Sequence, residues 1–113
     1  MNALKREKYQ NSYVYPTAVL CVDTALGDDI IKRAEHILKH DGYIVIKVVN
    51  FKHSTANENI SDMYNSMDMQ SIRNADVVIG VTISNDNKFE DSIAEALQYA
   101  KDNYVTTDTM HFV

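Results

Sequence analysis

The polar side chains best placed to bind a ligand follow two apolar runs of the sequence. Asp23 and Thr24 follow the first run, while Ser84, Asn85 and Asp91 lie in the segment after the third run. If those runs are neighbouring strands of a parallel sheet, both segments meet at one crevice outside the carboxyl ends of the strands. Lys88 is the one lysine or arginine in the segments 23–28 and 84–91. The pattern therefore favours a neutral ligand over a triphosphate.

Other kinds of chemistry are poorly supported by the sequence. His36 and His40 have the i, i+4 spacing of a zinc pair, but no glutamate is placed as in HExxH, and we expect two solvated histidines. Cys21 lies in an apolar run, where a thiol behaves as a small hydrophobic group. The glycines form neither a P-loop nor GxGxxG, and Asp28 and Asp29 would repel an anion from the helix that they begin. We predict no metal and no cofactor.

The elements that would position these residues alternate along the chain. Apolar runs of strand length occupy 18–22, 43–49 and 75–83, with a weaker run at 104–107. Amphipathic helical faces occupy 26–38, 60–72 and 89–100, and Gly42 is a candidate C-terminal cap of the first helix. Continuous apolar strands separated by helices predict a parallel sheet covered on both faces. The expected fold is a three-layer α/β/α, flavodoxin- or Rossmann-like domain with a four-stranded sheet of order 2-1-3-4.

Length and composition limit the organisation of the chain. Residues 1–16 form a polar arm ending at Pro16, and residues 17–113 are expected to form a single domain. With 11 basic and 16 acidic residues the net charge is −5, and no basic stripe suited to a nucleic-acid polymer is found. No apolar run approaches the roughly 18 residues of a membrane span, and the basic N-terminus lacks an apolar segment for secretion. With a single cysteine, these features predict a cytoplasmic location.

One part of the sequence resembles the nucleoside 2-deoxyribosyltransferase family. Members carry an aspartate late in a helix and, eight residues on, an Ala-Asp pair that opens an apolar strand, as do Asp68 and Asp76 here. After the strand they have an Asp-Ser turn, a glutamate and a helix ending in Tyr-Ala, which are similar to Asp91-Ser92, Glu95 and Tyr99-Ala100. The Gly42 and Thr107-Asp108 positions also fit. The resemblance extends loosely over 17–108 and is specific over 68–100.

The resemblance implies cleavage and transfer at a nucleoside N-glycosidic bond through a carboxylate nucleophile. A carboxylate suits the oxocarbenium-like transition state, and a second carboxylic acid assists the departing base. Glu95 would be the nucleophile, with Glu90 as a substitute. Catalytic Asp91 or Asp68 would orient base or sugar. The substrate-binding residues would be Asp23, Thr24, Ser84, Asn85 and Ser92.

The sequence leaves a second function open, a non-catalytic nucleotide-binding or protein-interaction module of the same fold. The family's Ser-Gly-Thr turn is Ser92-Ile93-Ala94 here, and its glutamate precedes the terminal alanine by four residues, where this chain has Ala96. At 100° per residue, Glu95 lies roughly 145° from the centre of the apolar stripe, which predicts a solvent-facing side chain.

We also expect a homo-oligomer. A four-stranded sheet with a weak last strand leaves an edge to protect. In the resembled family, neighbouring subunits complete each other's sites. Met63, Tyr64, Met67 and Met69 are either core residues or part of a subunit contact, and the 1–16 arm is the alternative cover for them.

Overall fold

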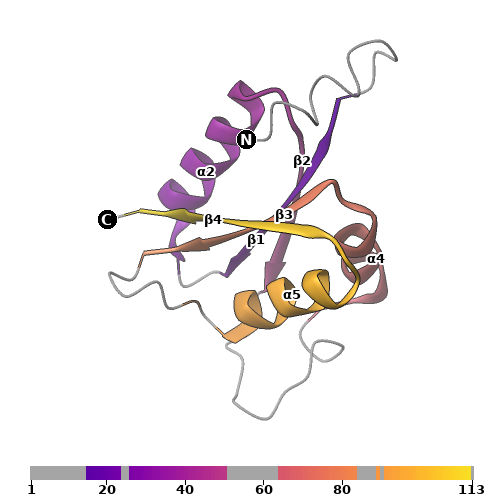
Figure 1. Ribbon diagram of the computed structural model, residues 1–113. Helices are drawn as coiled ribbons and strands as arrows, with labels where there is room; N and C mark the ends of the chain where they lie inside the picture. Colours follow the sequence, from indigo (N-terminus) through magenta and orange to yellow (C-terminus); the bar gives the residue numbers. More distant parts are fainter. Residues whose placement is uncertain (1–14, 24–25, 51–63, 84–88, 90, 113) are drawn as a thin grey trace.

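The computed structural model describes residues 15–23, 26–83 apart from 51–63, 89, and 91–112 (Figure 1). Strands and helices alternate along these residues. They are β1 (Thr17–Asp23), α2 (Asp28–His40), β2 (Ile44–Asn50), α4 (Ser66–Asn74), β3 (Val77–Thr82), α5 (Asp91–Asp102) and β4 (Thr106–His111). None of these helices is long and apolar enough to cross a bilayer. The predicted arm of residues 1–16 lies almost wholly outside the described residues.

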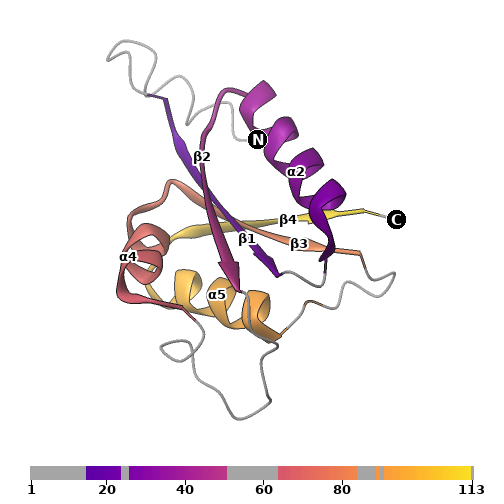
Figure 2. The same cartoon turned by 180° about the vertical axis from the view of Figure 1, so that it is seen from behind.

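The strands form one parallel sheet in the order β2-β1-β3-β4, which confirms the predicted topology. Helix α2 lies on one face of the sheet, and α4 and α5 lie on the other (Figures 1 and 2). Because β1 and β3 are central and covered on both faces, nearly all their side chains are buried. The predicted three-layer α/β/α architecture is therefore present.

Helix α5 packs closely against β3 at Gly80. A Cβ added there would lie 2.7 Å from the Leu97 Cδ1 atom and 2.9 Å from the Ile93 Cγ2 atom. The missing side chain lets the helix approach the strand. This glycine therefore lets α5 pack close to the middle of β3.

Helix α2 ends as its sequence predicts. Gly42 has φ +93°, its N–H donates to the Lys39 carbonyl, and the next N–H, of Tyr43, donates to the Leu38 carbonyl. This pair of bonds is the Schellman motif, in which a glycine in the left-handed region closes a helix. The prediction of Gly42 as the cap is confirmed.

The predicted bounds of two elements are wrong. The sequence predicts the last strand at 104–107, but it runs over Thr106–His111, because Tyr104 closes α5 in the left-handed conformation with φ 61°. The sequence predicts the second helix from residue 60, but α4 begins at Ser66, because the Asn65 side chain accepts a 2.8 Å hydrogen bond from the Asp68 N–H and caps it. Residues 60–63 of the predicted helix lie outside the described residues. Tyr64 therefore lies before the helix.

Candidate functional site

A buried polar pair lies at the carboxyl end of β1. The Ser92 hydroxyl, in the first turn of α5, donates a 2.8 Å hydrogen bond to the Asp23 Oδ2 atom. Asp23 is 1% exposed and Ser92 is fully buried. Because α5 follows β3, the pair spans the point between β1 and β3 where the strand order reverses. Two of the predicted binding residues are thus brought together at the carboxyl ends of the strands, where the crevice is predicted.

Tyr64 extends this pair into a cluster. Its hydroxyl donates a 3.0 Å hydrogen bond to the Ser92 carbonyl oxygen, and its side chain is buried. Burial raises the pKa of Tyr64, and the neighbouring Cys21, Asp23 and Asp68 raise it further. The phenol is therefore neutral at physiological pH and acts as a hydrogen-bond donor.

Cys21 lies on the same side of β1 as Asp23, because side chains two residues apart on a strand share a face. Burial raises the pKa of the Cys21 thiol to about 12, and the Asp68 carboxylate raises it as well. The thiol is protonated at neutral pH and is no nucleophile, as the sequence predicts. Asp68 is half-buried in the first turn of α4, close enough to Cys21 and Tyr64 for its charge to act on both.

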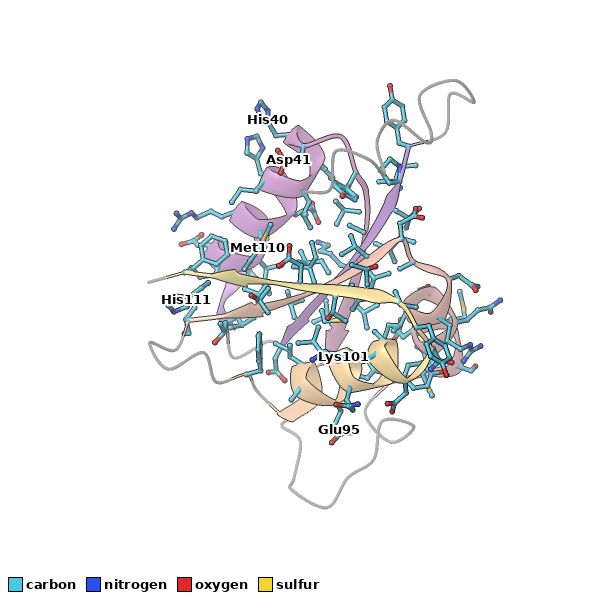
Figure 3. All side chains as sticks on the ribbon, viewed as in Figure 1. His40, Asp41, Glu95, Lys101, Met110 and His111 are labelled. Atoms are coloured by element: carbon cyan, nitrogen blue, oxygen red, sulfur yellow. The ribbon has the colours of Figure 1, made fainter. Side chains whose placement is uncertain are left out.

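Glu95 is not part of this cluster. It lies on the exposed side of α5 and points away from the sheet (Figure 3), while its neighbour Ala96 is fully buried. The helical wheel predicts this orientation. Its carboxylate faces solvent, although Glu95 is only three residues after Ser92 and about 60° around the helix from it.

Several predicted residues cannot be compared with the structure. Thr24, Ser84, Asn85 and Glu90 lie outside the described residues, and Asp91 is described only as the first residue of α5. Whether they line one crevice stays a prediction.

Asp76 lies at the amino ends of the strands, at the opposite end of the sheet from Asp23. Its Oδ2 atom accepts a 2.7 Å hydrogen bond from the Thr17 N–H, and its own N–H donates to the Thr17 carbonyl over 3.0 Å. Asp76, the residue before β3, is thus hydrogen-bonded to Thr17 at the start of β1. This aspartate, which is one of the residues that carry the family resemblance, has a structural role far from the carboxyl ends.

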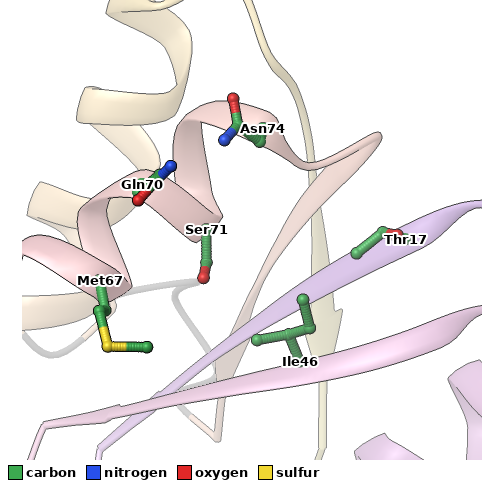
Figure 4. A pocket seen from close by; sticks show the side chains of 6 residues that line it. All are labelled: Thr17, Ile46, Met67, Gln70, Ser71 and Asn74. Atoms are coloured by element: carbon green, nitrogen blue, oxygen red, sulfur yellow. The ribbon is translucent and has the colours of Figure 1, made fainter.

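A pocket of about 320 Å³ lies between α4 and β2 (Figure 4). It is lined by Thr17, Ile46, Met67, Gln70, Ser71 and Asn74. None of the predicted site residues lines it. It is therefore a second surface feature, separate from the Asp23–Ser92 cluster.

The sequence does not predict Tyr64 as a member of the site. Its place among apolar residues at helical spacing assigned it to a helix face, and only the Asn65 cap sets it before the helix. The sequence holds no clear signal that its hydroxyl meets the Ser92 carbonyl. Within the described ranges, no three histidine, cysteine or carboxylate residues are grouped as metal ligands.

The fold and the cluster define a parallel α/β protein with a buried carboxylate at the switch point of its sheet. A scan of the sequence against models of known protein families finds no match, and a comparison with curated proteins finds none.

Proposed function

We propose that this chain binds a nucleoside in a crevice outside the carboxyl ends of β1 and β3. The observation that supports the proposal most directly is the buried Asp23–Ser92 pair at this edge. In open parallel sheets the ligand crevice lies beside the strands at the reversal of order, which here is between β1 and β3. The resemblance to nucleoside 2-deoxyribosyltransferases supports the choice of ligand.

A neutral ligand suits the charges near this edge. Helix α2 also begins here, and its first turn carries Asp28 and Asp29, which already complement the positive end of the helix dipole. A phosphate group would be repelled by these carboxylates and by Asp23. Sugar hydroxyls and base N–H groups, in contrast, are donors that carboxylates accept.

The outward position of Glu95 favours binding without turnover. Glycosyl transfer needs a carboxylate beneath the anomeric carbon, and the Glu95 side chain is exposed and points away from the sheet. A non-catalytic nucleoside-binding module is therefore the form of the proposal that the geometry supports best. The transferase is the second candidate, and it requires another carboxylate such as Glu90, or a different orientation of Glu95.

Titration calorimetry and an exchange assay test the two forms together. Deoxyadenosine and deoxyinosine are titrated into the protein, and each is also incubated with a free base while base exchange is followed by chromatography. We expect heat of binding without exchange, about tenfold weaker binding in Asp23→Asn, which corresponds to about 1.4 kcal/mol, and unchanged binding in Glu95→Ala.

Each other outcome points to a different conclusion. Exchange that Glu95→Ala abolishes would establish the transferase. No binding of either nucleoside to the folded wild-type chain would refute the proposal. Equal binding by Asp23→Asn and wild type would place the ligand elsewhere.

A further inference from the structure

The two edge strands of the sheet differ in what they expose. On β4 the exposed side chains are polar, including Thr106, Asp108 and His111. On β2 they include Ile44, which is 51% exposed, and Ile46, which is 38% exposed. Polar and charged edges discourage further pairing, whereas a long apolar edge is a template for another strand. The β2 edge is therefore better suited than the β4 edge to pair with a strand of another molecule.

The exposed isoleucines belong to a larger apolar surface. Ile46 lines the pocket between α4 and β2, and Met67 of α4, which is 76% exposed, faces the strand across it (Figure 4). Ile44 shares the face of Ile46, because it lies two residues away on the same strand. Among the described elements α4 packs mainly against α5, and the pocket lies between α4 and β2. We name Ile44, Ile46 and Met67 the β2 surface.

The backbone groups of β2 point in alternating directions. The Ile44 N–H donates to the Pro16 carbonyl, over 2.9 Å, so Ile44 and Ile46 direct their backbone groups towards β1. Val45, Lys47 and Val49 must then direct theirs to the outer edge. Among the described residues, no strand pairs with that edge.

The one charge in the middle of β2 is neutralised within its own chain. Lys47 Nζ lies 3.2 Å from Glu35 Oε2 of α2, on the face of the sheet opposite to the β2 surface. A second strand can therefore approach the edge without meeting an unpaired cation. Lysine on an edge strand otherwise opposes pairing.

We propose that β2 pairs antiparallel with β2 of a second copy of this chain, with the two Ile46 residues opposite each other on the two-fold axis. In this register the backbone of Val45 exchanges two hydrogen bonds with the backbone of Lys47 of the second copy. By symmetry, Lys47 exchanges two with Val45 of the second copy. Ile44 lies opposite Val48 of that copy. Of the two neighbouring registers, one would place the two Lys47 side chains opposite each other, which like charges disfavour. The other would place Val45 opposite Val45, and the cysteine variants below distinguish it from the proposed register.

The dimer buries the β2 surface of both copies on one face of a continuous eight-stranded sheet. An isologous contact of this kind needs a self-complementary patch, and an apolar strand edge flanked by an apolar helix residue fits that need. The pocket of about 320 Å³ in each copy then lies beside the shared seam.

Cysteine variants test the register directly. Cys21 is the single native cysteine and is buried, so an introduced thiol reports alone. In Ile46→Cys the two Cα atoms are expected about 4.5 Å apart, within reach of a disulfide, so mild oxidation should give a covalent dimer. Ile44→Cys is the matched control, since its two copies lie about 14 Å apart along the strands and should not be joined.

Sedimentation tests the association itself. The wild-type protein at micromolar concentration is expected at twice the chain mass of 12.9 kDa. Ile46→Lys should sediment as a monomer, because it places two cations opposite each other, whereas Thr109→Lys on exposed β4 should remain dimeric. A wild-type monomer, a dimer that persists in Ile46→Lys, or equal crosslinking of both cysteine variants would overturn the proposal.

Discussion

The hydroxyl of Ser92 donates a 2.8 Å hydrogen bond to the carboxylate of Asp23, 69 residues earlier in the chain. Both side chains are buried. The bond ties the first turn of α5 to the end of β1, so it contributes to stability as well as to the arrangement of the candidate site. A charged acceptor makes such a bond stronger than one between neutral groups.

Replacing Ser92 by alanine should therefore lower the free energy of unfolding by about 1–3 kcal/mol, because the buried Asp23 carboxylate loses a donor. Urea unfolding followed by circular dichroism measures the change. Ser66→Ala is the control, since Ser66 is exposed at the start of α4 and should give a change below about 0.5 kcal/mol. Equal stabilities of Ser92→Ala and wild type would contradict this account of the bond.

Tyr104→Gly should stabilise the protein by about 1 kcal/mol. Tyr104 has φ 61° and is 98% exposed, so it bears the cost of the left-handed conformation without burying its ring. Its N–H closes α5 on the Lys101 carbonyl, a position that glycine usually occupies. Thermal unfolding provides the measurement. Tyr104→Ala retains the steric cost and should show no comparable gain.

Gly80→Val should destabilise the protein by about 1–3 kcal/mol or more, and Gly80→Ala by less. A single Cβ already lies within 3 Å of both Leu97 and Ile93, and two further methyl groups have no space between β3 and α5. Chemical unfolding of both variants gives the comparison. A valine variant as stable as wild type would show that α5 can move away without loss.

Cys21 should resist thiol reagents in the folded protein at pH 8 and react fully in urea, because it is buried with a pKa of about 12. The raised pKa also makes stability depend on pH. The unfolded thiol ionises near 9.0, so its contribution is complete below that pH and is lost progressively as the pH rises towards 12.

Urea unfolding at pH 8 and at pH 10 tests this dependence. The free energy of unfolding of the wild type should fall between the two values, and the fall should be smaller in Cys21→Ala. Tyr64, whose pKa is also raised, accounts for part of the remaining decline. Identical declines in both proteins would contradict the assignment to Cys21.

The sheet could be predicted from the sequence because its central strands are apolar without interruption. Val77 to Val81 can be buried on both faces only between two layers of helices, and that requirement fixes a parallel sheet with few possible orders. The first and last residues of β4 were harder to predict. Its sequence, TTDTMH, is polar, and its length follows from pairing with β3 through Thr82 and His111.

The candidate site was predictable only where a strand end fixed the position of a side chain. Asp23 is the last residue of β1, so the strand pattern predicts its position. The outward position of Glu95 is predicted by helical periodicity. The contact between Tyr64 and Ser92 could not be predicted, since it joins a residue before one helix to the backbone of another. Such a contact depends on how α4 and α5 pack, which local pattern does not specify.

The topology of the sheet also has a kinetic consequence. Because every strand pair is parallel, each pairing joins distant parts of the chain: Thr17 with Ile44, Ala18 with Val77, and Val77 with Thr106. None of these ladders can nucleate as a local hairpin, so the entropy of closing long loops is lost before the contacts form. Refolding should therefore be slow for a domain of this size, because β1 pairs with β3 across a segment that includes the described elements α2, β2 and α4.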